Sequence, residues 1–156
     1  MRLRKVFATL TATLLASLIA TSAASAACTI STTAVSFGNY DVFTSSPLDA
    51  AGQVSFRCTG IVPVSITITL DKGGAPTFNP RRLLQGGEAL NYNLYLDAAR
   101  TNIWGDGTGG TGTYTQLIIL TLLGQTITVP VYGRIPASQN VSVGTYTNTV
   151  TATISF

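Results

Sequence analysis

Apolar and polar residues alternate with a period of two along much of the chain, whereas helical periodicity is nearly absent. Residues 64–70 set Val, Ile and Leu between Ser and Thr, and residues 90–96 set Leu and Tyr between Asn and Tyr. Such alternation predicts half-buried β-strands. It is clearest at the C-terminus, where Thr and Ser line one face and the other carries Tyr146, Val150, Ala152, Ile154 and Phe156.

Further strands are predicted over residues 29–37, 53–58, 114–123 and 126–131. Pro130, inside the last of these, indicates an edge position or a bulge because proline donates no ladder hydrogen bond. Clusters of Gly, Pro, Ser and Asp separate the strands as turns. Strands and turns in this order predict one antiparallel β-sandwich domain over residues 27–156, with no repeat and no linker.

Residues 1–26 are predicted to be a secretory signal peptide. The first five residues carry three cations, residues 6–20 are apolar, and Ala-Ser-Ala at 24–26 offers the small residues that signal peptidase requires. A membrane anchor is the competing interpretation, but the apolar run is short for a membrane span. We therefore expect no span in the mature chain and a secreted protein.

Export favours a disulfide between Cys28 and Cys58, the two cysteines of the chain. In the chain-entropy model, closing a loop of this size stabilises the fold by about 3–4 kcal/mol. Acylation of Cys28 as a lipoprotein is the alternative. It would leave Cys58 unpaired, and Ser25 stands where lipoprotein processing wants a leucine-like residue.

Composition excludes several classes of function. The chain has no histidine, so Ser-His-Asp sites and His-ligated zinc are impossible, and two cysteines cannot hold a four-thiolate metal. Three of the nine basic residues lie in the first five positions, which leaves a mature chain with six basic and six acidic residues. We expect no nucleic-acid partner, no metal, no cofactor and no enzymatic activity.

The glycine-rich tract Gly105–Gly112 matches a dinucleotide fingerprint formally, but a threonine-rich strand follows it where that fingerprint needs a helix. Trp104 and Tyr114 border the tract. We expect both to pack over the end of the sandwich, and the alternative is that they form an exposed surface contact patch. Asp97 and Arg100 follow a predicted strand and suggest an ion pair that stabilises a turn.

A set of short motifs runs through the chain: Cys-Thr-Ile at 28–30, Val-Ser-Phe-Gly-Asn-Tyr at 35–40, Val-Ser-Phe-Arg-Cys-Thr-Gly at 54–60, Leu-Asn-Tyr-Asn-Leu-Tyr at 90–95, Asp-Ala-Ala-Arg-Thr-Asn at 97–102, Val-Pro-Val-Tyr-Gly-Arg-Ile at 129–135 and Gly-Thr-Tyr-Thr-Asn-Thr-Val at 144–150. Together they resemble the spore coat protein U domain, the pilin-type domain of archaic, Csu-like chaperone–usher pili. The resemblance covers essentially all of residues 28–156.

The resemblance implies an immunoglobulin-like sandwich that lacks one strand and is completed by donor-strand complementation. A periplasmic pilus chaperone supplies the strand first, and a neighbouring pilin subunit replaces it at the usher. The protein is then expected in the periplasm and later at the cell surface or in a pilus. The acceptor edge corresponds to the C-terminal strand, with Tyr146, Val150, Ala152, Ile154 and Phe156 lining the groove and the Phe156 carboxylate held by the chaperone.

One feature departs from the family pattern. A polymerising pilin needs an alternating apolar arm before its first cysteine, and residues 21–27 contain no large apolar side chain. We therefore expect a non-enzymatic structural subunit at a fibre end, as a tip or cap. The alternatives are an adhesive tip module that contacts surfaces through Trp104 and the Gly105–Gly112 loop, or a secreted coat domain that is complete by itself.

Overall fold

The computed structural model describes residues 26–60, 63–119, 121 and 123–156, so the predicted leader lies outside the described residues except for Ala26. No helix among the described residues is long and apolar enough to cross a membrane. The regular structure of this part is entirely β-strand: β1 Ala27–Thr33, β2 Leu48–Thr59, β3 Pro63–Leu70, β4 Arg81–Gln85, β5 Glu88–Tyr95, β6 Tyr114–Ile119, β7 Gln125–Ile135 and β8 Ala152–Ser155.

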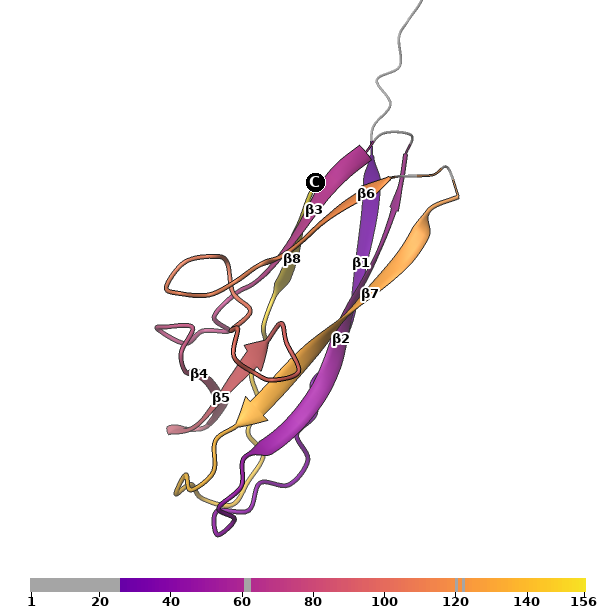
Figure 1. The fold of residues 1–156 in the computed structure, drawn as a ribbon. Coiled ribbons are helices and arrows are strands. Elements are labelled where there is room, and N and C mark those ends of the chain that lie inside the picture. The colour runs from indigo at the N-terminus through magenta and orange to yellow at the C-terminus, as the bar shows by residue number, and fades with distance from the viewer. Residues whose placement is uncertain (1–25, 61–62, 120, 122) are drawn as a thin grey trace, which may run out of the picture.

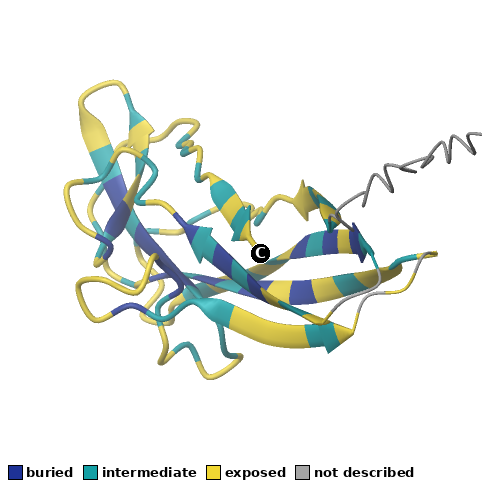
Figure 2. Ribbon diagram, turned by 90° about the horizontal axis from the view of Figure 1, so that it is seen from above, coloured by how far each residue is buried: buried dark blue, intermediate teal, exposed yellow. Residues whose placement is uncertain are grey.

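The strands form two antiparallel sheets, which confirms the predicted all-β sandwich. One sheet has the order β1-β2-β7-β5-β4 and the other the order β6-β3-β8 (Figure 1). Buried and exposed residues alternate along the strands (Figure 2), as the period-two pattern requires. The core lies between the sheets and includes Val54, Phe56, Ile66, Ile68, Leu90, Tyr92, Leu94, Val129, Val131 and Ile135.

The disulfide between Cys28 and Cys58 is present and joins β1 to β2. The two cysteines lie directly opposite each other in the antiparallel register. The bond therefore fastens the first strand of the domain to the sheet, and Cys58 is itself buried in the core.

Pro130 lies within β7, which is a central strand of the larger sheet, yet the edge prediction holds locally. β7 pairs with β2 over its whole length, whereas β5 pairs only with residues 132–134. At Pro130 the strand has β2 as its one paired neighbour, opposite Gln53. A proline is tolerated there because the other side of the strand has no ladder to complete.

The first strand ends at Thr33, earlier than the predicted 29–37, because the chain then crosses the larger sheet. Two glycines make room for this crossing. A β-carbon on Gly52 would lie 2.5 Å from the carbonyl oxygen of Thr33, and one on Gly133 would lie 2.7 Å from side-chain atoms of both Val35 and Phe37. Glycine thus lets the segment that follows β1 lie against the sheet.

Candidate functional site: a groove beside the C-terminal strand

The C-terminal segment, residues 146–156, keeps the predicted alternation but is paired on one side only. Tyr146, Val150, Ala152 and Ile154 are half-buried, and the odd-numbered residues between them are exposed. Regular pairing is limited to β8, which pairs with β3 and with no other described strand. Nearer the start of the segment, Thr147 forms a single bridge to Leu84 of β4 in the other sheet. The segment therefore passes from one sheet to the other with its second edge unpaired.

A groove runs beside this segment. It consists of two adjoining cavities of about 280 and about 900 Å³, which share Ala34, Val35, Phe37, Leu83 and Asn148 in their linings. Residues 32–42, which include the end of β1, form one wall, and residues 141–152 form the other. The smaller cavity is floored by core side chains: Val54, Leu70, Tyr92, Leu94 and Val131.

The predicted acceptor residues thus lie together along one line, but they do not all line the groove. Val150 and Ala152 line the smaller cavity and Tyr146 the larger one. Ile154 packs against the core cluster, and the side chain of Phe156, 53% exposed, extends beyond it. None of these residues reaches full burial, because the sandwich has no further strand on this side among the described residues.

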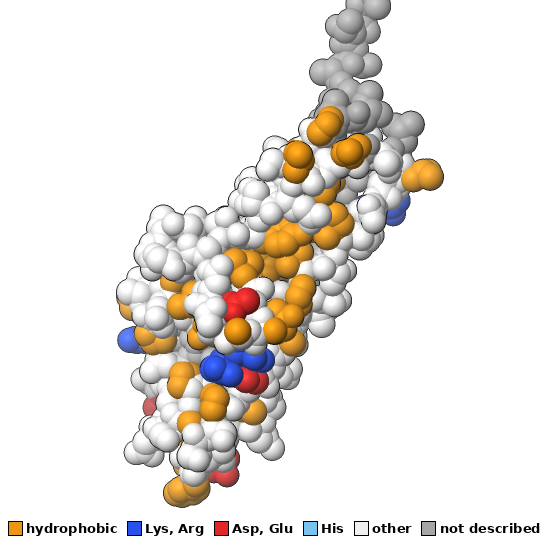
Figure 3. Space-filling model, in the orientation of Figure 1, with side chains coloured by type: hydrophobic (Ala, Val, Ile, Leu, Met, Phe, Trp, Pro, Cys, Tyr) orange, Lys and Arg blue, Asp and Glu red, His pale blue; other side chains and the backbone are white. Residues whose placement is uncertain are grey.

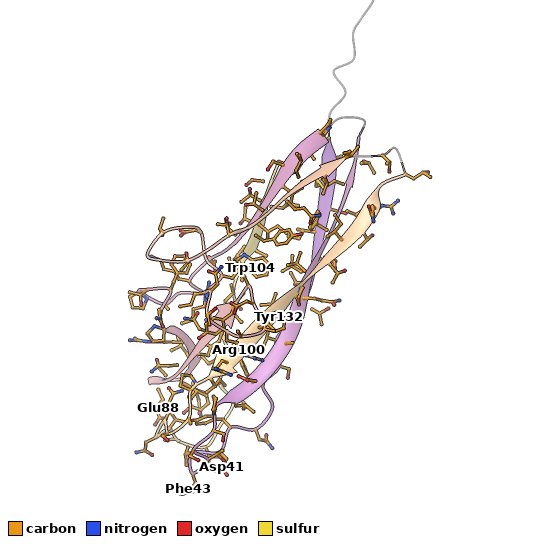
Figure 4. All side chains as sticks on the ribbon, viewed as in Figure 1. Asp41, Phe43, Glu88, Arg100, Trp104 and Tyr132 are labelled. Atoms are coloured by element: carbon orange, nitrogen blue, oxygen red, sulfur yellow. A yellow bond between two sulfur atoms is a disulfide. The ribbon has the colours of Figure 1, made fainter. Side chains whose placement is uncertain are left out.

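The carboxylate of Glu88, which begins β5, fastens the lower part of the groove wall (Figure 4). It accepts hydrogen bonds from the Ser142 hydroxyl, from the Ser142 backbone N–H at 2.8 Å and from the Tyr146 hydroxyl at 2.7 Å. These bonds, with that of the Ser142 hydroxyl the strongest influence, hold the pKa of Glu88 at about 2, below its ordinary 4.5. The wall is therefore held by an ionised group through the whole neutral range.

This network predicts a defined acid sensitivity. Because the folded-state pKa of Glu88 is depressed, its contribution to stability is complete above about pH 4.5 and is lost as the pH falls toward about 2. We expect Glu88→Gln to lower the urea midpoint at pH 6, with a difference from the wild type that shrinks toward zero near pH 2. Urea titrations across that pH range measure it. An equal difference at pH 3 and pH 6 would show that the carboxylate charge is irrelevant.

Trp104 does not form an exposed contact, so the surface-contact alternative is wrong and its packing against the core is confirmed. Its side chain is fully buried inside the sandwich (Figure 4), and its indole N–H donates to the backbone oxygen of Ile68 at 2.9 Å. Tyr114 is half-buried, with its ring 6.3 Å from those of Trp104 and Phe56. Both aromatic residues complete the core because the loop that follows β5 folds over it.

Exposed apolar side chains lie elsewhere and were missed by sequence reasoning. Phe43 and Val143, outside the strands, are 93% and 100% exposed, and a further group lies at the end of β6. Leu117, Ile119 and Leu123 are 71%, 81% and 82% exposed, at the end of the molecule where β6 finishes and β7 begins (Figure 1). Figure 3 shows hydrophobic side chains gathered at this end, beside the grey segment. The continuous run over 117–120 predicts a buried strand, but only one face of β6 lies on the core, so Ile118 faces inward while Leu117 and Ile119 face outward. Leu120 lies outside the described residues.

Several charged residues of the described chain form structural contacts. Asp49 binds Arg134 through both carboxylate oxygens at 2.7 and 2.8 Å and lies 3.2 Å from Arg100. The predicted ion pair between Asp97 and Arg100 is absent, since the Asp97 carboxylate accepts backbone N–H groups of Thr101 and Asn102 instead. No group of three or more potential metal ligands occurs among the described residues.

Comparisons with known proteins agree on the family. A family model for the Spore Coat Protein U domain matches residues 11–153. Protein U of Myxococcus xanthus is 37% identical over 148 residues, which cover 83% of this chain and 77% of that protein. The residues that the family model matches include both walls of the groove.

A solved structure shares the fold. It is the crystal structure of the CsuC-CsuE chaperone-tip adhesion subunit pre-assembly complex from archaic chaperone-usher Csu pili of Acinetobacter baumannii. One of its chains superimposes with a TM-score of 0.56 at 21% identity; the match covers 84% of this chain and 40% of that chain. The present chain thus spans about two-fifths of its length, and the likeness concerns the fold. On these findings the chain belongs to the Spore Coat Protein U domain family, as a structural, non-enzymatic member.

Proposed function

We propose that the protein is a secreted, pilin-like subunit of a chaperone–usher pilus or a coat-like surface assembly, and that it accepts a β-strand from a partner. The observation that carries this proposal is the C-terminal segment, whose alternating apolar residues are half-buried beside a groove and whose second edge is unpaired. Family membership supports a structural role.

An added strand would satisfy this edge in two ways. Its backbone would hydrogen-bond to the free edge of residues 146–156, and alternate apolar side chains would enter the groove over Leu70, Tyr92 and Leu94. Filling the groove would remove that apolar surface from water, at roughly 25 cal/mol per Å². The strand is thus both a hydrogen-bonding partner and a missing part of the core.

The partners that fit this chemistry are a periplasmic pilus chaperone, an usher and a neighbouring pilin subunit. The fold neighbour is described as a chaperone-tip adhesion subunit pre-assembly complex, which supports a chaperone as the first donor. The disulfide agrees with passage through an oxidising compartment, the periplasm, before the cell surface. We assign the subunit a terminal position, tip or cap, because residues 21–27 hold no large apolar side chain to donate.

An adhesive role is the second candidate, and it has a different basis from the one predicted. Trp104 is buried and is no longer a contact residue. The exposed Leu117, Ile119 and Leu123 instead favour contact with an apolar surface at the end of the domain. Loss of adhesion in Leu123→Ser with unchanged stability would support this role.

The test of the main proposal is expression of the full chain with its own leader in a periplasm, with and without a co-expressed pilus chaperone. Without the chaperone we expect most of the chain to aggregate or be degraded, with a small soluble monomeric fraction left, and with the chaperone we expect a soluble one-to-one complex. A soluble monomer in equal yield under both conditions would contradict the proposal. It would favour a secreted coat domain that is complete by itself.

A further inference from the structure

The two walls of the groove are joined at one end by Tyr40. This residue belongs to the first wall, where its ring lines the larger cavity and packs against the core. Its hydroxyl donates a hydrogen bond to the backbone oxygen of Pro136 at 3.0 Å and accepts one from the backbone N–H of Gln139 at 2.8 Å. Pro136 and Gln139 lie in the segment that leads from β7 into the second wall, so the hydroxyl connects one wall to the base of the other.

The far side of this connection is itself fixed to a sheet. The side-chain amide of Gln139 donates to the backbone oxygen of Asn91 at 2.9 Å and accepts from the Asn91 backbone N–H at 2.8 Å. Asn91 is part of β5, so Gln139 pairs with β5 as one residue of a neighbouring strand would. Tyr40 is therefore tied to the larger sheet through Gln139 rather than to a free loop.

The chain reaches this point through a turn that needs glycine. Gly38 has a φ of +73°, in the left-handed region that side chains disfavour, and a β-carbon there would meet no atom within 4 Å. The glycine thus serves the backbone conformation, not close packing. The conspicuous Phe-Gly-Asn-Tyr stretch at 37–40 then has a physical purpose, because Phe37 fills the core and Tyr40 closes the groove end.

The other end of the groove has no such connection. Thr32, Gln53 and Ala152 line it, but β1 pairs with β2 and β8 pairs with β3, in different sheets. No hydrogen bond joins β1 to β8 among the described residues. The two ends of the groove therefore differ: one is bridged by a hydroxyl held on both sides, and the other is open.

We propose that Tyr40 is a positioning residue that makes the groove blind at this end, so that an inserted strand stops there and takes its register from it. This inference rests on the proposed strand-accepting function and adds to it a limit on the length of the strand. The partner is a peptide in which apolar residues alternate with polar ones. One end of this peptide contacts the ring of Tyr40. Extra residues at that end gain no contact, whereas extra residues at the open end continue along β8.

The test measures affinities of synthetic peptides for the exported, disulfide-bonded chain by fluorescence anisotropy. The core peptide alternates valine with threonine over about eight residues, the length that lies beside residues 146–153 at about 3.3 Å per residue, so that a further pair at the open end continues along β8 to Ser155. Two longer peptides carry one further valine–threonine pair at the N-terminus or at the C-terminus. The proteins are the wild type, Tyr40→Ala, Tyr40→Phe, and Tyr132→Phe as a control tyrosine outside the groove lining.

For the wild type and Tyr132→Phe, we expect the extension that lies at the open end of the groove to tighten binding at least fivefold. The extension that meets Tyr40 should change the affinity less than twofold. In Tyr40→Ala and, to a smaller degree, Tyr40→Phe, the ineffective extension should become effective. Equal gains from both extensions in the wild type, or an unchanged asymmetry in both Tyr40 variants, would overturn this inference alone. Failure of the core peptide to bind the wild type would overturn the proposed function and this inference with it.

Discussion

Replacing Arg81 with alanine is expected to destabilise the domain by about 3–5 kcal/mol, the largest effect of a single substitution that we anticipate. Arg81 is completely buried and has no carboxylate partner within salt-bridge distance among the described residues. Its guanidinium donates to the backbone oxygens of Asp71 and Trp104 and to the Asn93 side chain at 2.7–3.0 Å. Alanine leaves a cavity and unpaired acceptors, of which those at Asn93 and Trp104 are buried, and the free energy of unfolding of native domains is only about 5–15 kcal/mol.

Urea unfolding of matched variants measures this effect. Arg81→Lys keeps the charge but not the planar fork that reaches three acceptors, so we expect an intermediate loss. Arg82→Ala, one residue along β4, removes an exposed arginine and should cost less than about 0.5 kcal/mol. A loss below about 1 kcal/mol for Arg81→Ala would show that the network does not hold the end of β3, β5 and the Trp104 loop together.

Replacing Ala152 with arginine should abolish strand binding and leave the domain folded. Ala152 is half-buried in β8 and lines the smaller cavity beside Leu70 and Val150. A long side chain there occupies the space that an incoming apolar residue needs, while its guanidinium extends along the open groove into solvent. We expect the core peptide to bind at least 100-fold more weakly, equivalent to about 2.7 kcal/mol.

Thr153→Arg is the matched control, since Thr153 is exposed and its side chain points to the opposite face of β8. It adds the same charge and bulk one position away and should change the affinity less than threefold. Both affinities are measured by fluorescence anisotropy with the same labelled peptide. Equal weakening by the two variants would show that the peptide responds to charge near the C-terminus and does not enter the groove.

The strands that were predicted correctly are those in which burial alone decides the pattern. β3 has one face in the core and a less buried face of Ser and Thr, so apolar and polar residues alternate along it. β5 alternates in the same way, although Asn93 on its second face is also buried. β4 was missed because its Arg-Arg-Leu-Leu-Gln sequence does not alternate. Its first residue, Arg81, is an arginine at a fully buried position, which depends on acceptors from three distant parts of the chain.

The candidate site was predicted in part, for the same physical reason. Alternation over 146–156 indicates a strand with one apolar face, and the half-burial of Val150 and Ala152 agrees with it. Alternation cannot show that the segment changes sheets between Thr147 and Ala152, because that depends on which strands lie beside it. The Tyr40 connection is likewise hidden, since it joins residues separated by almost 100 positions.

The aromatic residues beside the glycine-rich tract allowed two interpretations from the sequence, and the structure shows the buried one. Trp104 borders a glycine-rich sequence that is typical of a surface loop, yet its indole lies in the core. Backbone hydrogen bonds from Trp104 to Leu94 and from Gly105 to Gly112 fold the loop inward. The close approach of Thr111 explains why residue 105, which follows Trp104, is a glycine. A β-carbon on Gly105 would lie 2.3 Å from the Thr111 hydroxyl oxygen. Local composition indicated a surface loop, and tertiary hydrogen bonds determined which side chains it buries.

Urea unfolding of the exported chain at increasing concentrations of the core peptide tests the central claim, that a strand from outside completes the sandwich. We expect the free energy of unfolding to rise by about 1.4 kcal/mol for each tenfold increase in peptide above its dissociation constant. We also expect Ala152→Arg to remove this rise and Thr153→Arg to retain it. A single cooperative transition at the same urea midpoint for every peptide concentration would contradict the account and show a sandwich that is complete without a partner.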